Sequence, residues 1–168
     1  MSATQSMSML ERRRLEAKLL AHVYKTLVAS HGEAVARQAI ADSVRAAAIE
    51  QGQEMAKSLG AKTSLQTFID AQELWTRGKA LEIDVKEQSG DRFVFHVTNC
   101  EYARMYQEMG LGHIGHLLSC QRDGTICEGY DARLKLKRTQ TIMQGATHCD
   151  FEYTYDETGA NSEGASKS

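Results

Sequence analysis

The 168-residue chain is predicted to be an α+β protein, with N-terminal helices packed on an antiparallel sheet of about four strands. Two observations predict this class. Apolar residues recur at helical spacing in the first part of the chain, and from residue 81 the apolar period changes to two, in paired segments separated by turn residues. We expect a single domain over residues 1–156 and a disordered, Gly/Ser/Ala-rich tail over residues 157–168.

Three helices are expected before residue 80. The first carries an apolar series and ends near Gly32, a residue type suited to a helix C-terminus. The second covers residues 33–59, and its many alanines permit close helix packing. The third begins after a cap at Thr63 or Ser64 and ends at Gly78. The apolar series of the first helix consists of Leu10, Leu15, Leu19, Val23 and Leu27.

A β-hairpin is expected next, because apolar and polar residues alternate on both sides of a turn at residues 89–91. Its two strands cover residues 81–86 and 93–98. A helical pattern then returns over residues 100–109, and a further short helix is expected over residues 114–120.

The rest of the domain is interpreted as a loop followed by a second hairpin. Residues 121–130 are assigned to the loop. A long strand over residues 134–142 turns at residues 144–146 into a last strand over residues 149–155.

Composition and charge exclude several classes of function. The chain has 20 Lys and Arg against 22 Asp and Glu, so it lacks the basic excess that nucleic acids attract. It has no run of about 18 apolar residues that could span a membrane, and no secretory signal, so we expect a cytoplasmic protein. The expected partner is a small-molecule substrate. The apolar stripe of the long helices exceeds what a small sheet would cover, which favours a homo-oligomer.

The reactive residue types gather in the second half of the chain. The four cysteines, at positions 100, 120, 127 and 149, lie there with four of the six histidines. Cys100 ends a predicted strand and opens a predicted helix, where backbone N–H groups lower the pKa of a thiol. Such a thiolate is a nucleophile or a soft metal ligand, and the alternative is a buried cysteine without a chemical role.

Short motifs for other chemistries are missing from the sequence. It contains no GxGxxG, GxxxxGK[ST], GxSxG or HExxH motif, so dinucleotide, P-loop, serine-hydrolase and zincin functions have no support. It also has no CxxC pair. A divalent metal such as zinc on Cys100, Cys120 and Cys149 stays open as an arrangement in three dimensions, although the spacing does not support it.

Three sequence blocks in the second half of the chain carry three of the four cysteines. The first is Asn99-Cys100 with Ala103 and Glu108-Met109-Gly110, and the second is Cys120-x-x-Asp123. The third runs from Arg138-Thr139-Gln140-Thr141-Ile142 through Gly145 to Cys149-Asp150-Phe151. Together, in this order, the blocks resemble the L-2-amino-thiazoline-4-carboxylic acid hydrolase family. The resemblance covers residues 93–155, and Cys127 stands outside the shared blocks.

The resemblance implies hydrolysis of a C–N bond in a cyclic amidine of a small carboxylated heterocycle. This reaction needs a nucleophile, a proton donor for the departing nitrogen and a group that holds the carboxylate. The implied catalytic residues are Cys100, as nucleophile or metal ligand, with Cys149 and the proton carriers Asp123, His148 and Asp150. The implied substrate-binding residues are Asn99, Arg104 and Arg138.

A second class of function stays open from the sequence. The same scaffold suits a non-catalytic module that senses a small molecule or a metal through clustered cysteines. An enzyme needs an acid or base beside its thiol, whereas a sensor needs only ligands or an apolar cavity.

Overall fold

The α+β class that the sequence predicts is confirmed, with N-terminal helices and an antiparallel sheet of four strands. The computed structural model describes residues 7–60 and 62–158. The helical elements are α1 (Met9–His31), α2 (Glu33–Ser58), α3 (Leu65–Asp70), α4 (Glu73–Thr76), η1 (Arg77–Lys79), α5 (Glu101–Glu108), η2 (His116–Cys120), α6 (Arg122–Tyr130) and η3 (Ile142–Gln144). The strands are β1 (Leu81–Gln88), β2 (Arg92–Cys100), β3 (Leu134–Lys137) and β4 (Cys149–Tyr155).

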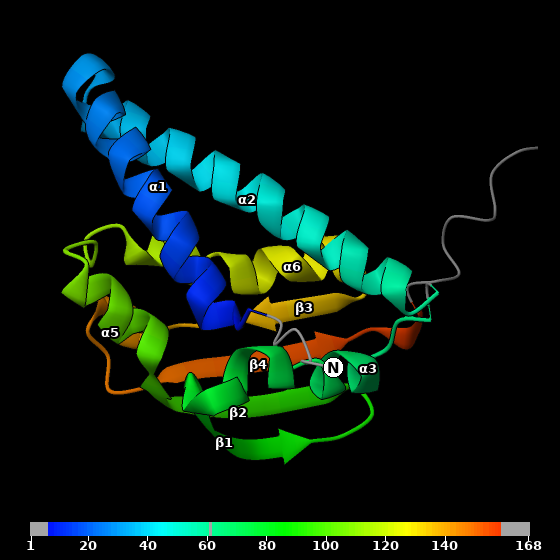
Figure 1. Ribbon diagram of the computed structural model, residues 1–168. Helices are drawn as coiled ribbons and strands as arrows, with labels where there is room; N and C mark the ends of the chain where they lie inside the picture. The colour runs from blue at the N-terminus through cyan, green and yellow to red at the C-terminus, as the bar shows by residue number, and fades with distance from the viewer. Residues whose placement is uncertain (1–6, 61, 159–168) are drawn as a thin grey trace, which may run out of the picture.

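The two long helices α1 and α2 form a hairpin that projects past the sheet (Figure 1). Helix α1 begins at a capping box, in which the Ser8 side chain accepts from the Glu11 N–H and the Glu11 carboxylate accepts from the Ser8 N–H. Gly32, with φ of +85°, reverses the chain between the helices, as predicted. Helix α1 leaves Leu15 and Leu19 exposed, and homo-oligomer formation stays a prediction.

The segment 121–130, predicted as a loop, is the helix α6, which lies between α2 and the sheet (Figure 1). Two glycines make this packing close. A Cβ at Gly129 would lie 2.0 Å from the Ile49 carbonyl oxygen, and one at Gly52 would lie 2.3 Å from that of Ile126. Gly52 and Gly129 therefore allow the backbones of α2 and α6 to pack closely, whereas the sequence pattern predicts a loop over residues 121–130.

The third predicted helix is divided into α3 and α4. Ser64 caps α3 through the Thr67 N–H, as expected from the choice of Thr63 or Ser64. Helix α3 ends at Asp70, and α4 covers Glu73–Thr76. The break after Asp70 divides a segment that was predicted as continuous.

The sheet has the strand order β1-β2-β4-β3, with every neighbouring pair antiparallel. Both predicted hairpins are present, and β4 lies inside the sheet beside β2. The predicted strand 134–142 is too long, because β3 ends at Lys137. Beyond it, the Asp150 carboxylate accepts from the backbone N–H groups of Thr139 and Gln140, at 3.0 and 2.8 Å, so these groups bond to a side chain instead of a strand.

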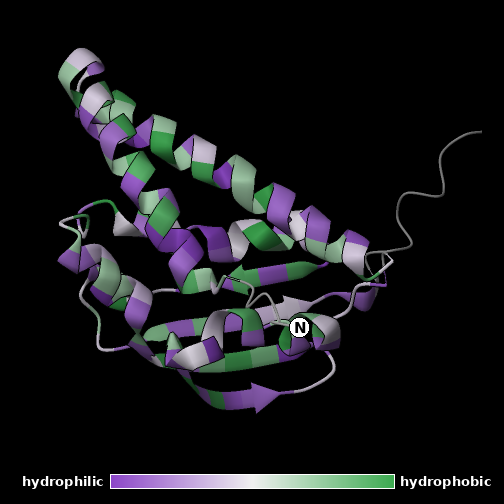
Figure 2. Cartoon of the chain, viewed as in Figure 1, coloured by the Kyte–Doolittle hydropathy of each residue, from purple (hydrophilic) through white to green (hydrophobic). Residues whose placement is uncertain are grey.

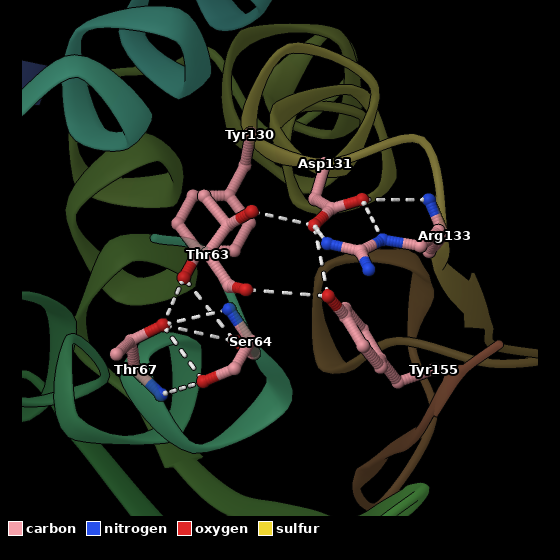
Figure 3. Close-up of polar contacts among 7 residues, drawn as sticks. All are labelled: Thr63, Ser64, Thr67, Tyr130, Asp131, Arg133 and Tyr155. Atoms are coloured by element: carbon pink, nitrogen blue, oxygen red, sulfur yellow. Dashed lines mark hydrogen bonds and ion pairs between the residues drawn. The ribbon is translucent and has the colours of Figure 1, made fainter. Parts of the chain in front are cut away.

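A polar cluster joins the far end of α6 to α3 and β4 (Figure 3). Asp131 accepts hydrogen bonds from the Thr63 hydroxyl at 2.6 Å, from the Tyr155 hydroxyl at 3.0 Å, and from both the backbone and the guanidinium of Arg133. We call these four residues the Asp131 clamp. The adjacent Tyr130 hydroxyl contacts Ser64 and Thr67.

Apolar residues alternate with polar ones along β2 and β4 (Figure 2), and the apolar face packs against the helices. The core divides into a cluster under α1 and α5 and a cluster on the sheet. Trp75, Leu81, Cys100 and Ile142 pack against both clusters. Cys100 therefore lies at the seam of the core.

Over the described part of the chain, no helix combines the length and apolar character required to cross a membrane. Most of the predicted disordered tail, residues 159–168, lies outside the described residues.

Candidate functional site

A cavity of about 50 Å³ lies at the seam between the helical layer and the sheet. Its polar lining consists of thiols, one aspartate, arginines and a serine, set among aromatic and aliphatic side chains. The side chains that carry charge or a thiol are Arg13, Cys100, Cys120, Arg122, Asp123, Arg138 and Cys149. Segments from both halves of the chain therefore build one chamber.

Three of the four cysteines line this cavity, and the fourth does not. Cys100 ends β2 and begins α5, and its Sγ accepts from the Ala103 N–H at 3.4 Å. Cys149 opens β4, and its Sγ accepts from the Ile142 N–H at 3.2 Å. Cys120 ends η2. Cys100, Cys120 and Cys149 therefore line one cavity, while the Cys127 thiol is buried elsewhere in the core and donates to the Asp123 carbonyl.

Burial keeps the cavity thiols protonated. Burial raises the pKa of Cys100 to about 11, although the Ala103 N–H at the helix start lowers it. Burial likewise raises the pKa values of Cys120 and Cys149 above the ordinary value for a thiol. The prediction that the helix start lowers the pKa of Cys100 is therefore wrong, because loss of water outweighs the local N–H groups.

The carboxylate of the cavity is paired with a guanidinium from the segment that follows β3. Asp123 lies in the first turn of α6, and its Oδ2 accepts from Nη1 of Arg138 at 2.5 Å. Arg138 also donates to the Cys120 carbonyl at 2.9 Å and lies over the Phe151 ring, 5.0 Å from its centroid. Burial raises the pKa of Asp123, and Arg138 opposes this. The carboxyl is thus suited to accept and return a proton at a pH above the usual range for aspartate.

Two further arginines in the cavity wall escaped the sequence analysis. Arg13 of α1 and Arg122 of α6 are 3% and 5% exposed. Arg13 lies in the run Arg12-Arg13-Arg14, which by itself is typical of a solvated helix face. Nothing in that run distinguishes Arg13 from its neighbours, and only the structure shows that Arg13 is buried and pairs with Glu16 at 2.8 Å.

Four of the predicted site residues lie outside the cavity. Asp150 of β4 binds the backbone of Thr139 and Gln140, and the ring of His148, just before β4, stacks on His96 with 4.2 Å between centroids. Successive side chains of a strand face opposite sides of the sheet, so the alternation over residues 149–155 already indicates that Asp150 and Cys149 face apart. Asn99 and Arg104 do not line the cavity either, because both contact Glu101 on the outside of α5.

The donor set does not fit the predicted metal. Among residues 7–60 and 62–158, no group of three or more His, Cys, Asp or Glu side chains is arranged to hold a metal ion. A zinc site requires about four ligands at about 2.0–2.3 Å.

Comparison with known proteins gives one family and a shared fold. The family model described as L-2-amino-thiazoline-4-carboxylic acid hydrolase matches residues 12–153. No curated protein matches the chain. A solved structure of trafficking protein particle complex subunit 3 from Naegleria fowleri, covalently bound to palmitic acid, is similar over 87% of this chain and 96% of its own, with a TM-score of 0.51 and 8% identity.

A second solved structure is the phenol-responsive sensory domain of the transcription activator PoxR with phenol. It covers 83% of this chain and 73% of its own, with a TM-score of 0.48 and 14% identity. At such identities the first of these two structures shows a common fold and no more.

Proposed function

The chain belongs to the L-2-amino-thiazoline-4-carboxylic acid hydrolase family, and on this premise we propose that it opens a C–N bond in a small cyclic amidine that carries a carboxylate, similar to 2-amino-thiazoline-4-carboxylate. One observation supports the proposal above the others. The cavity holds the Cys100 thiol together with Asp123, whose pKa burial raises. A nucleophile and a proton carrier thus share a chamber that excludes most water.

The proposed reaction has two stages and starts from the protonated amidine. In the first stage the Cys100 sulfur attacks the carbon between the ring sulfur and ring nitrogen, and Asp123 accepts the thiol proton. The C–N bond then breaks as Asp123 returns this proton to the ring nitrogen, which departs as an amine. In the second stage water adds to the same carbon and gives a proton to Asp123. The bond to Cys100 then breaks, Asp123 returns the proton to the Cys100 sulfur, the proton of the original amidine stays on the freed amine, and the product is an S-carbamoyl-cysteine. Asp123 supplies the base that a thiol with a pKa of about 11 requires at neutral pH.

Arg138 acts as a positioning residue in this scheme. Its guanidinium is already engaged with the Asp123 carboxylate and the Cys120 carbonyl. A neighbouring cation keeps the carboxylate available in its ionised form. This role replaces the direct contact with the substrate carboxylate that the family resemblance implied for Arg138.

The test is turnover of 2-amino-thiazoline-4-carboxylate by purified protein, followed by chromatography of the carbamoyl-cysteine product. Cys100→Ala should lower kcat by at least about 100-fold, because the nucleophile is lost. Cys127→Ala is the matched control, since this buried thiol lies outside the cavity and its loss should leave kcat unchanged. Turnover by Cys100→Ala at the wild-type rate would contradict the proposal.

A non-catalytic binding module is the second candidate. The observation that favours it is the protonated state of every cavity thiol, which suits a chamber that holds a ligand without attacking it. Saturable binding of the thiazoline carboxylate with no product after prolonged incubation would select this alternative.

A further inference from the structure

Two buried guanidiniums in the cavity wall share a single carboxylate. Arg13 donates through Nη1 to both oxygens of Glu16, at 2.9 and 2.8 Å, and Arg122 donates through Nη2 to Glu16 Oε2 at 3.0 Å. Their other hydrogen bonds go to neutral groups. Arg13 donates to the Gln51 side chain at 2.8 Å, and Arg122 donates through Nε to the Leu118 carbonyl at 2.9 Å. The two guanidiniums and the one carboxylate together therefore carry a net charge of +1.

This excess charge is held where water reaches poorly. Both arginines are at most 5% exposed, whereas the Glu16 side chain is 36% exposed. Burial and the neighbouring Arg13 lower the pKa of Arg122 to about 10. Burying a cation without a matching anion is unfavourable, so two cations on one carboxylate indicate a place for a second anion.

The position of Glu16 shows on which side that anion fits. Arg13 and Arg122 line the cavity, and Glu16 does not. Glu16 thus holds the two guanidiniums from behind, on the side of α1 that faces solvent. The third arginine of the cavity, Arg138, is paired with Asp123. The chamber therefore holds one arginine whose charge is matched by an aspartate and two arginines that share one glutamate.

We propose that Arg13 and Arg122 form a subsite that binds the carboxylate of a small monoanionic ligand inside the cavity. That the ligand contains a heterocycle rests on the proposed function. That it carries one negative charge rests on the two arginines alone. Guanidinium groups bind carboxylates in a planar, two-pronged geometry, which suits this anion. A single excess charge and a chamber of about 50 Å³ favour a carboxylate over a phosphate ester.

The subsite would set the orientation of the substrate. A carboxylate bound at Arg13 and Arg122 directs the heterocycle toward the rest of the cavity lining, which includes Cys100 and Asp123. A ligand that lacks the carboxylate would lose these contacts and leave the excess charge unmatched. Selectivity for carboxylated rings is therefore the measurable consequence.

The experiment measures binding without turnover, by calorimetry in buffer free of phosphate and sulfate. The probes are thiazolidine-4-carboxylate, a saturated ring with no amidine carbon to attack, and its carboxamide. Wild-type protein should bind the carboxylate at least about 10-fold more tightly, because the neutral carboxamide cannot form the charge-assisted hydrogen bonds to the two guanidiniums. Arg122→Gln should abolish this preference. Arg45→Gln is the matched control, because Arg45 pairs with Glu128 on the surface.

Arg13→Lys is a second variant, which retains the positive charge but removes the two-pronged donor geometry of the guanidinium. It should reduce the preference for the carboxylate over the carboxamide while the protein stays folded. Equal binding of the two probes by wild-type protein, or binding of neither at millimolar concentration, would overturn the subsite and leave hydrolysis untouched. A preference for the carboxylate without any ring opening of 2-amino-thiazoline-4-carboxylate would support the subsite and overturn the proposed hydrolase. The two proposals therefore fail separately.

Discussion

The two ends of α6 each carry an aspartate paired with an arginine, and their pKa values move in opposite directions. Asp123 in the first turn bonds to Arg138 at 2.5 Å, and Asp131 at the C-cap bonds to Arg133 at 2.7 Å. Burial raises the pKa of Asp123. Burial also raises the pKa of Asp131, but hydrogen bonds donated by Arg133, Thr63 and Tyr155 outweigh burial and lower this pKa well below the ordinary value.

The helix macrodipole would produce the reverse order. It stabilises a carboxylate at the N-terminus of a helix, where Asp123 lies, and disfavours one at the C-terminus, where Asp131 lies. The number of hydrogen-bond donors outweighs this effect. Several donors hold the Asp131 carboxylate in its ionised form, while the Asp123 carboxylate is buried in the cavity wall and bonds to Arg138. The comparison separates a carboxylate that fastens the fold from one that is able to exchange a proton.

The largest expected effect is on catalysis. Asp123→Asn should lower kcat for 2-amino-thiazoline-4-carboxylate by about 10²–10⁴-fold, because the amide cannot accept the thiol proton. Asp131→Asn, at the other end of the helix, should leave kcat of the folded protein within about twofold. Steady-state assays on both variants, with circular dichroism to verify folding, measure the difference. Equal losses of kcat in the two variants would show that Asp123 in the cavity has no greater role in catalysis than Asp131 in the clamp.

The next largest effect concerns the cavity thiol. Because burial raises the pKa of Cys100 to about 11, its alkylation at pH 7 should be about 100-fold slower than that of free cysteine, and its rate should rise with pH over the range studied. Iodoacetamide labelling from pH 7 to 10, with mass spectrometry of the peptide that contains Cys100, measures this. Rapid labelling at pH 7 would mean that the helix N-terminus governs the thiol after all.

The smallest effect is on the free energy of unfolding. Its dependence on pH has opposite signs for substitutions at the two ends of α6. Asp131→Asn should cost about 2 kcal/mol near pH 7, because it weakens charged hydrogen bonds to buried partners. A lowered folded-state pKa contributes stability above the unfolded value of about 3.9, so this cost should shrink as the pH falls below about 3.9.

For Asp123 the sign is reversed. A raised folded-state pKa contributes stability that is complete below about 3.9 and is lost as the pH rises through the raised value. The cost of Asp123→Asn should therefore shrink as the pH rises above about 3.9. Urea titrations of both variants and the wild type between pH 3 and 7 test the two opposite slopes. Parallel slopes would show that the two carboxyls titrate alike.

Much of the fold follows from local patterns in the sequence. Alternation marks β1, β2 and β4, because side chains in a strand point to opposite faces in turn. Helical spacing and Gly32 mark α1 and α2. Three shared blocks also place Cys100, Cys120 and Cys149 in one family pattern, and the cavity brings these three residues together.

Only the tertiary structure decided the remaining elements and the electrostatics of the site. Gly52 and Gly129 lie 77 positions apart, and their contact with the opposite backbone turns a predicted loop into the buried helix α6. Arg13 reads as part of a charged helix face until packing buries it beside Arg122. The raised pKa of Cys100 likewise depends on burial by segments that are distant in the sequence. Periodicity is a property of neighbouring residues, whereas the desolvation of a charge depends on every segment that excludes water from it.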